Sequence, residues 1–170
     1  MNVLHLVHRT VRPPSGAVVF SDTSNSPLAR VVACGSTAPV AAVTALARSL
    51  AVDPADSQAG PRIRPAGLIT EMASRPGRRI ETWLAWEALS GEIAAVGLVT
   101  LITVCRGDQT RHSIGWLLVH PAARRRGLGR MLVATALAAA ECQAADEVWV
   151  ESKVHWTSAI CFWRACGFAE

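Results

Sequence analysis

Hydrophobic and polar residues follow two different periods along the chain, and these periods predict its secondary structure. In the middle of the chain, three segments rich in Val, Ile, Thr and Trp are predicted as β-strands: Arg79–Ala88, Ile93–Cys105 and His112–Val119. Short turn signals at Ser90–Gly91 and Gly107–Asp108 join them. Strands this close in sequence predict an antiparallel meander.

The pattern becomes helical in the last third of the chain. A helix predicted over Leu128–Ala145 is apolar almost all round, so it should lie buried on a sheet. Glu147–Lys153 is predicted as a strand, and Thr157–Cys166 as a final helix that Gly167 ends as its C-terminal cap. This third therefore adds a helix, a strand and a second helix to the meander.

The first third gives weaker signals. Leu28–Cys34 is predicted as a strand, and Ala66–Ser74 as a short helix. Between them, Asp53–Pro65 is a loop crowded with Pro, Gly, Asp and Ser. A further helix precedes this loop, because three apolar residues recur there at helical spacing: Val43, Leu46 and Leu50.

The length of 170 residues suits one domain, which we predict over residues 28–170. Residues 1–27 follow no pattern that predicts an element. The longest uncharged apolar run, Ile93–Cys105, has thirteen residues, whereas a membrane-spanning helix needs about 20. Met1–Arg12 lacks the apolar core of a signal peptide. These features argue against a membrane protein and favour a cytoplasmic one.

Composition narrows the chemistry further. The five cysteines are odd in number and include no CxxC pair, which favours reduced thiols over a disulfide framework. The five histidines form no HxH or HxxxH pair, so we predict no metal site. Among the 17 basic residues only Lys153 is not an arginine, and guanidinium groups suit phosphate and carboxylate recognition. A net charge of +4 argues only weakly for nucleic-acid binding.

The most informative segment follows the strand that ends at Val119. It contains three consecutive arginines, then two glycines one residue apart at the start of the long helix. Glycine lets the backbone approach a ligand closely and adopt a positive φ. The N–H groups and the dipole of a helix start favour an anion such as a pyrophosphate, and arginine side chains add charge-assisted hydrogen bonds.

This segment resembles the acetyl-CoA-binding signature of the GNAT N-acetyltransferase superfamily. The matching residues are Arg124-x-x-Gly127-x-Gly129, after a strand that ends in Val-His-Pro. A second stretch is similar to the family's fifth strand, fourth helix and closing Gly-Phe pair; it runs from Val148 to Phe168. The two matches come in the family's order and together cover about residues 93–168.

The resemblance implies an α+β fold, a mixed and mostly antiparallel sheet flanked by helices that splays open between the fourth and fifth strands. Here those strands are His112–Val119 and Glu147–Lys153. It also implies acetyl-CoA as co-substrate, with the pantetheine arm in the splay and the pyrophosphate on amides of the following loop. By position, the implied cofactor-binding residues are Leu117, Leu118, Val119, Arg124, Arg125, Arg126, Gly127, Leu128, Gly129 and Arg130.

Acetyl transfer to an amine requires the neutral amine. A lysine-like amine has a pKa of about 10.4, so its deprotonation near pH 7 costs roughly 4–5 kcal/mol, a barrier that a general base lowers. The resemblance places Glu151 where ribosomal-protein acetyltransferases of the family have a glutamate base. A merely solvated carboxylate is an equal alternative for Glu151. Glu87 is an alternative base. His120 is a further alternative, although we expect it to shape the loop before Pro121.

Three features depart from the family pattern. Trp156 replaces the usual Asn at an implied cofactor-binding position, and Trp163 replaces the catalytic Tyr that assists the departing thiolate. The chain contains no tyrosine, and an indole N–H can donate a hydrogen bond but is not a practical proton donor. The sequence also stops soon after Gly167, where the family adds one or two strands. This leaves open a fragment or a domain completed by another chain, as in a homodimer.

The sequence therefore predicts an acetyltransferase that moves an acetyl group from acetyl-CoA directly to an amine of a small molecule or peptide, with Glu151 as general base. A non-catalytic acyl-CoA-binding or sensor domain is the alternative, which Trp156, Trp163 and the short C-terminal segment favour. A nucleic-acid-binding module is a weaker third interpretation, because the helix after Arg126 is too apolar for groove contact.

Overall fold

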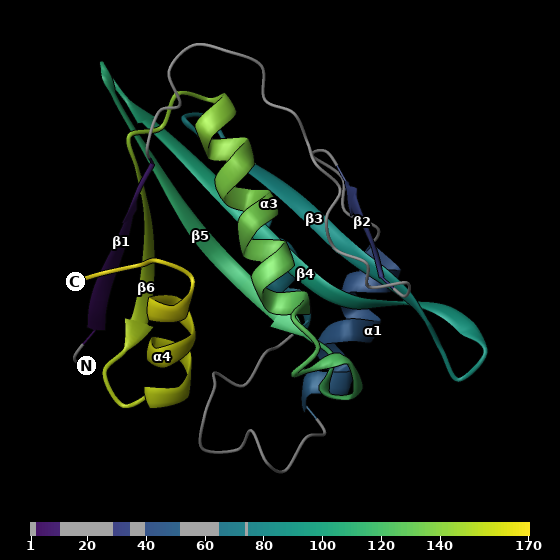
Figure 1. Ribbon diagram of the computed structural model, residues 1–170. Coiled ribbons are helices and arrows are strands. Elements are labelled where there is room, and N and C mark those ends of the chain that lie inside the picture. The colour runs from purple at the N-terminus through teal and green to yellow at the C-terminus, as the bar shows by residue number, and fades with distance from the viewer. Residues whose placement is uncertain (1–2, 11–28, 35–39, 52–64, 74) are drawn as a thin grey trace.

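The computed structural model describes residues 3–10, 29–34, 40–51, 65–73 and 75–170. A six-stranded sheet of order β1-β6-β5-β4-β3-β2 forms its centre (Figure 1). The strands are β1 (Val3–Arg9), β2 (Arg30–Ala33), β3 (Arg78–Leu89), β4 (Glu92–Arg106), β5 (Gln109–Val119) and β6 (Glu147–Lys153). The α-helices are α1 (Val40–Ala51), α2 (Pro65–Glu71), α3 (Leu128–Cys142) and α4 (Thr157–Ala165).

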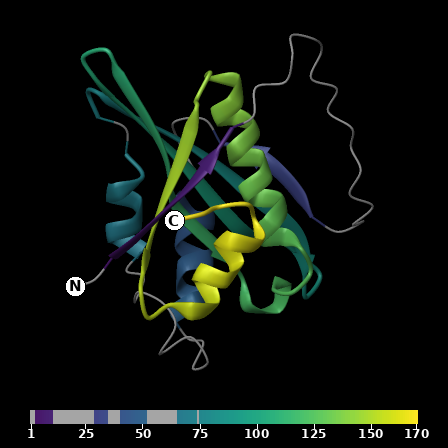
Figure 2. The ribbon, with the colours of Figure 1, turned by 60° about the vertical axis from the view of Figure 1, so that its left-hand side comes forward.

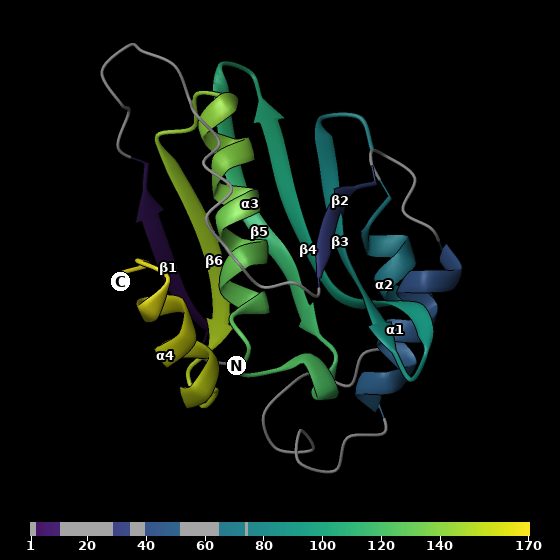
Figure 3. The same cartoon turned by 45° about the vertical axis from the view of Figure 1, so that its right-hand side comes forward.

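Helices cover both faces of the sheet (Figures 1 and 3). α3 and α4 lie on one face, where Leu132 and Trp163 join a core with Val99 and Val148. α1 and α2 lie on the other face, over the half of the sheet that β3 and β4 form. Among the described residues, no helix has the length and apolar character needed to cross a membrane.

The meander predicted from the middle of the chain is confirmed. β3 pairs antiparallel with β4, and β4 with β5. The first hairpin turns at Ser90 and Gly91, whose φ angles of 53° and 87° are the left-handed pair that a two-residue turn requires. The sheet is therefore mixed, with a single parallel pair between β5 and β6 among the described strands.

The helix predicted over Leu128–Ala145 begins at the expected residue but ends three residues early, at Cys142. Ala144 has a φ of 57°, and the Ala145 N–H donates to the Ala140 carbonyl at 3.0 Å, so a left-handed cap stops the helix. Alanines continue at helical spacing through this cap, which explains why the predicted helix was three residues too long. Gly167, with a φ of 89°, ends α4 as predicted.

The N-terminal segment holds an element that the sequence did not reveal. Val3–Arg9 form β1, which pairs antiparallel with all of β6. Leu6 is fully buried in the core beneath α3 and α4. Ala169 in turn exchanges two backbone hydrogen bonds with Val7, so the last residues run beside β1 (Figure 2). The sheet thus includes residues left outside the predicted domain.

The helix predicted around Val43, Leu46 and Leu50 is confirmed as α1, whereas two other elements of the first third are shorter than predicted. β2 covers only Arg30–Ala33, and α2 runs from Pro65 to Glu71. The predicted loop over Asp53–Pro65 lies outside the described residues except for Pro65 itself, and so do residues 11–28.

Candidate functional site

β5 and β6 separate after a short parallel stretch. His112–Ile114 pairs with Val148–Val150, and beyond these residues β5 continues along β4 while β6 continues along β1. The two strands therefore diverge towards their carboxyl ends (Figure 3). This is the splay that the resemblance implied between these two strands; beyond Ile114 and Val150 their main chains no longer pair with each other, and we call this gap in the pairing the opening.

A bulge in β5 lies at the start of the opening. Val99 pairs with Leu117 and Leu101 with Ile114, so β5 has one more residue than β4 in this interval. The Trp116 N–H donates to the hydroxyl Oγ1 of Thr100 at 2.8 Å, in place of a ladder partner. The bulge thus redirects the β5 backbone where the strand meets the opening.

Thr100→Val is expected to lower the free energy of unfolding by about 1–3 kcal/mol, because it leaves the Trp116 N–H without its acceptor. Thr100 is only 1% exposed, so water cannot easily replace the hydroxyl. Urea unfolding measures the change. Thr100→Ser keeps the acceptor and is the matched control; equal stabilities of the valine and serine variants would contradict this role.

The loop between β5 and α3 leads into a helix start without a side-chain cap. His120 shapes its beginning, since its Nδ1 accepts from the Ala122 N–H at 3.2 Å. Arg125 and Gly127 both have left-handed φ angles, 63° and 83°. α3 then starts with Gly127 as an N-cap that has no side-chain hydrogen bond. The first N–H groups of α3 therefore remain available to a ligand, and the helix dipole favours a negative one.

The two glycines of the motif serve different purposes. A Cβ on Gly127 would meet no atom within 4 Å, so the space beside it is open to a ligand. A Cβ on Gly129 would lie 3.3 Å from the ring of Phe162 on α4, so Gly129 lets the two helices pack closely. Sequence spacing alone suggested close approach to the ligand for both residues.

The four arginines also differ. Arg124 donates from Nε to the Val119 carbonyl at 3.2 Å, and Arg126 makes a 2.7 Å ion pair with Glu87 on β3. Arg125 and Arg130 are exposed, and within the described part of the chain neither has an ion pair or hydrogen bond. The predicted cofactor-binding residues thus come together around one opening, but not all of their side chains face it.

The strand residues predicted to hold the pantetheine arm lie at the edge of the opening. One edge of the β5 backbone pairs with β4 at three of these residues, Leu117, Leu118 and Val119. Leu118 is buried under α1 and α2, whereas Leu117 and Val119 pack against the core on the opposite face. Their side chains are occupied with packing, so only their main chain is suited to a ligand.

Glu151 follows Val150, the last β6 residue that pairs with β5. Strand alternation places its side chain on the sheet face of α1 and α2, opposite to the buried Val150. Its carboxylate is 69% exposed and lies 3.7 Å from Nδ1 of His5, its cross-strand neighbour on β1. A carboxylate beside the opening, with an imidazole next to it, is suitably placed for proton transfer.

The two tryptophans that replace family residues have different surroundings. Trp163 is only 7% exposed, and its ring packs edge-on against Phe162 and Phe168. The distances between the ring centroids are 5.2 and 5.3 Å. Trp156 is half-buried at the N-cap of α4, with the Lys153 ammonium 5.1 Å from its ring. Trp163 is therefore a core residue in this structure, whatever further role it has.

Sequence reasoning missed the groups that frame the opening on the side of α2. The indole Nε1 of Trp116 donates to Glu71 Oε2 at 3.0 Å, which ties α2 to the bulge. Bulges leave no reliable sequence signal, although the glycine at position 115 within a strand is a weak one. The third missed residue is His5, whose strand was not predicted.

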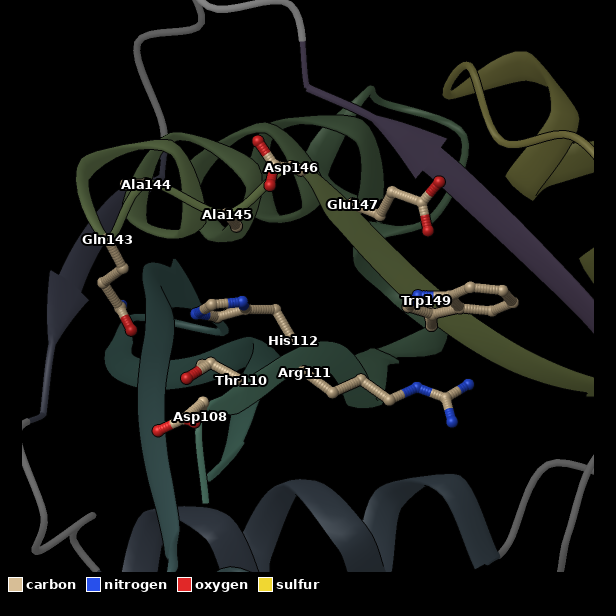
Figure 4. Close-up of a pocket in the computed structure, with 10 residues that line it drawn as sticks. All are labelled: Asp108, Thr110, Arg111, His112, Gln143, Ala144, Ala145, Asp146, Glu147 and Trp149. Carbon is tan, nitrogen blue, oxygen red and sulfur yellow. The ribbon is translucent and has the colours of Figure 1, made fainter. Parts of the chain in front are cut away.

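A hollow of about 650 Å³ lies at the other ends of β5 and β6, where the two strands begin (Figure 4). It is lined by polar residues that include Asp108, His112 and Asp146. The Arg111 guanidinium stacks 4.5 Å from the centre of the Trp149 ring. Because β5 and β6 are parallel, this hollow is separated from the arginine-rich loop by the length of the strands.

The described residues give little support to a metal centre or a cysteine nucleophile. No group of His, Cys, Asp and Glu that could hold a metal ion occurs among the described residues. Burial raises the pKa of the Cys166 thiol, and the charge of Arg130 offsets only part of this effect, so Cys166 is not an activated nucleophile near neutral pH.

Residues 55–168 match the acetyltransferase (GNAT) family, and the match spans more than half of the chain. The protein therefore belongs to this family of acetyltransferases, whose members generally transfer acyl groups from acyl-CoA. No curated protein sequence matches the chain.

Solved structures agree with the fold. A tandem GNAT protein from the clavulanic acid biosynthesis pathway covers 98% of this chain with 19% identity and a TM-score of 0.64. A putative GNAT acetyltransferase from Novosphingobium aromaticivorans covers 98% with 17% identity and a TM-score of 0.61. The chain spans only 49% and 58% of these two proteins.

A third similar structure matches over most of its own length. It is an aminoglycoside acetyltransferase from an uncultured soil metagenomic sample, in complex with trehalose. Its identity to this chain is 15% and its TM-score 0.60, with 84% of this chain and 90% of that protein covered. At such identities the likeness shows the fold alone.

Proposed function

We propose that this protein is an N-acetyltransferase that transfers the acetyl group of acetyl-CoA to the amine of a small molecule or peptide. The observation that carries this proposal is the opening between β5 and β6, which leads directly to the uncapped N-terminus of α3. A thioester arm fits between two unpaired strand edges, and a pyrophosphate fits a helix start rich in free N–H groups.

In this proposal each part of the opening has a separate task. Main-chain groups of Leu117 to Val119 hold the pantetheine arm, and the amides from Arg125 to Arg130 hold the pyrophosphate, with Trp156 at the rim. Acetyl-CoA supplies the thioester. Glu151 accepts a proton from the acceptor ammonium, directly or through water, so that the amine nitrogen can attack the thioester carbon. As the C–S bond breaks, the nitrogen gives its second proton to water and the departing thiolate takes one proton from water, so the amide and the free thiol are released and one net proton remains on Glu151.

The proposal also includes the acceptor amine and the cellular compartment of the protein. The aminoglycoside acetyltransferase with a similar fold makes aminoglycosides one group of amines to test. The five cysteines are all free, which fits a reducing compartment such as the cytoplasm.

Calorimetry with CoA and an assay of thiol release test the function. The protein is mixed with acetyl-CoA and a panel of aminoglycosides, polyamines and peptides with free amino groups. We expect CoA binding and amine-dependent thiol release. CoA binding without turnover of any amine would support the second candidate below, and no CoA binding would exclude both.

The second candidate is an acyl-CoA-binding domain without catalysis. The burial of Trp163, at the position where the family has a tyrosine, favours it, because no phenol is available to protonate the thiolate. Loss of a general acid costs about 10²–10⁴-fold in rate. The thiol of the leaving group has a pKa near 8.5, however, so its thiolate leaves with little help.

Trp163→Tyr separates the two candidates. In an enzyme, the new phenol is expected to raise kcat, by less than the 10²–10⁴-fold of a full acid catalyst. The smaller ring leaves a void, so the free energy of unfolding should fall by about 1–2 kcal/mol. Steady-state thiol release measures the first effect and urea unfolding the second.

Trp83→Tyr is the matched control, because Trp83 is 9% exposed in the same core but lies on β3. It should lose stability without a gain in kcat. A fall of kcat in Trp163→Tyr alone would show that the indole itself assists the reaction.

A further inference from the structure

Glu87 is a buried carboxylate with a specific partner. Its side chain is only 8% exposed, and Oε1 lies 2.7 Å from Nη2 of Arg126, whose side chain is 39% exposed. A carboxylate so far from water needs a compensating charge or hydrogen bonds. Since Arg126 belongs to the loop before α3, this ion pair ties the loop to the end of β3, two strands away from β5.

Glu87 lies beside the loop before α3 and away from Leu117. The strand register aligns Leu117, at the edge of the opening, with Val99 on β4 and Trp83 on β3. Glu87 is four residues further along β3, about 13 Å at the usual rise per residue, and two strands away from β5. Glu87 as general base stays a prediction; in this structure its carboxylate is paired with Arg126.

The conformation of the loop explains why such an anchor is useful. Arg126 lies between Arg125 and Gly127, both of which have left-handed φ angles. Residues other than glycine adopt this conformation only at a cost, so an unanchored loop would relax. On the other side, Arg124 is held by the Val119 carbonyl. Two arginine side chains, one on each side of Arg125, thus fix the loop to the sheet.

We propose that Glu87 is a positioning residue, which holds Arg126 and so fixes the amides of residues 125–130 in the arrangement that binds the pyrophosphate. The exposed Arg125 and Arg130 then contact phosphate, while Arg126 does not. This inference rests on the proposed function, because the pyrophosphate belongs to acetyl-CoA.

Glu87→Gln and Glu87→Ala test the anchor in two ways. The first readout is hydrogen exchange of the loop amides, measured by mass spectrometry without CoA; we expect faster exchange in both variants. The second is affinity: the loss of a hydrogen bond to a charged group should raise the CoA dissociation constant about 10-fold in Glu87→Ala. The kcat at saturating acetyl-CoA and its pH profile should not change.

Glu81→Gln is the matched control, since Glu81 is also on β3 and also pairs with an arginine, Arg79, at 2.6 Å. It should change neither readout. In a double-mutant cycle, Arg126→Ala should add little to the effect of Glu87→Ala, because both remove the same interaction. Arg125→Ala should add its effect in full.

The outcomes separate the anchor from the proposed function. Faster loop exchange in the Glu87 variants, in a protein that binds no CoA, would retain the anchor and exclude the function. Unchanged loop exchange in the Glu87 variants, with a parent protein that binds CoA, would overturn the anchor alone. Tighter CoA binding by Glu87→Gln would overturn it too, because Arg126 would then be a phosphate ligand restrained by Glu87. A large fall of kcat with an altered pH profile in the Glu87 variants would also overturn the anchor.

Discussion

Gly127→Glu is expected to weaken acetyl-CoA binding at least about 100-fold. The substitution removes hydrogen bonds from the loop amides to the charged pyrophosphate and adds repulsion between two negative groups. The φ of 83° at Gly127 strains any side chain. The space around its absent Cβ is empty, so the new carboxylate would occupy the place of the pyrophosphate at the start of α3. Isothermal titration calorimetry with acetyl-CoA measures the effect.

Two further variants separate charge from backbone strain. Gly107 also has a left-handed φ, 57°, with no atom within 4 Å of its absent Cβ, but it lies in the turn between β4 and β5. Gly107→Glu should therefore leave the affinity unchanged. Gly127→Ala adds the strain without the charge and should give an intermediate affinity. An affinity of Gly127→Glu equal to that of the parent would refute the placement of the pyrophosphate.

Glu151→Gln is expected to lower kcat by about 10²–10⁴-fold, the usual contribution of a general base, with little change in CoA affinity. The variant keeps the size and the exposure of the side chain beside the opening, and it removes only the ability to accept a proton. Steady-state rates measured from acid to alkaline pH show the effect. The rate of the variant should continue to rise with pH, because hydroxide or the free amine then replaces the base.

Glu147→Gln is the control for this substitution. Glu147 stands four residues earlier on β6, on the same face of the strand, where it pairs with Arg9 at 3.5 Å. It lines the hollow at the far end of the strand and should not affect turnover. Equal rates and pH profiles in Glu151→Gln and the parent would leave Glu151 as a solvated carboxylate and assign deprotonation to bulk water.

Local sequence patterns determined most of the elements from Arg78 onwards. Alternation and β-branched residues marked β3, β4 and β5, and glycines with left-handed φ marked the ends of α4 and of the first hairpin. The loop before α3 was also readable, because its arginines and glycines are neighbours in the chain. Such signals depend on residues close in sequence, so they survive without knowledge of the partner elements.

Tertiary structure decided what depends on distant partners. β1 is a strand because it completes the edge of β6, about 140 residues further along the chain. The bulge depends on Thr100 accepting from Trp116, and His5 reaches Glu151 only through cross-strand pairing. The three consecutive arginines look equivalent in the sequence, yet Glu87 and the Val119 carbonyl hold two of them and leave Arg125 exposed. The sequence thus determined the residues of the loop before α3. Long-range pairing brought Trp116, Glu71 and His5 into place and determined which of the loop side chains are free to act.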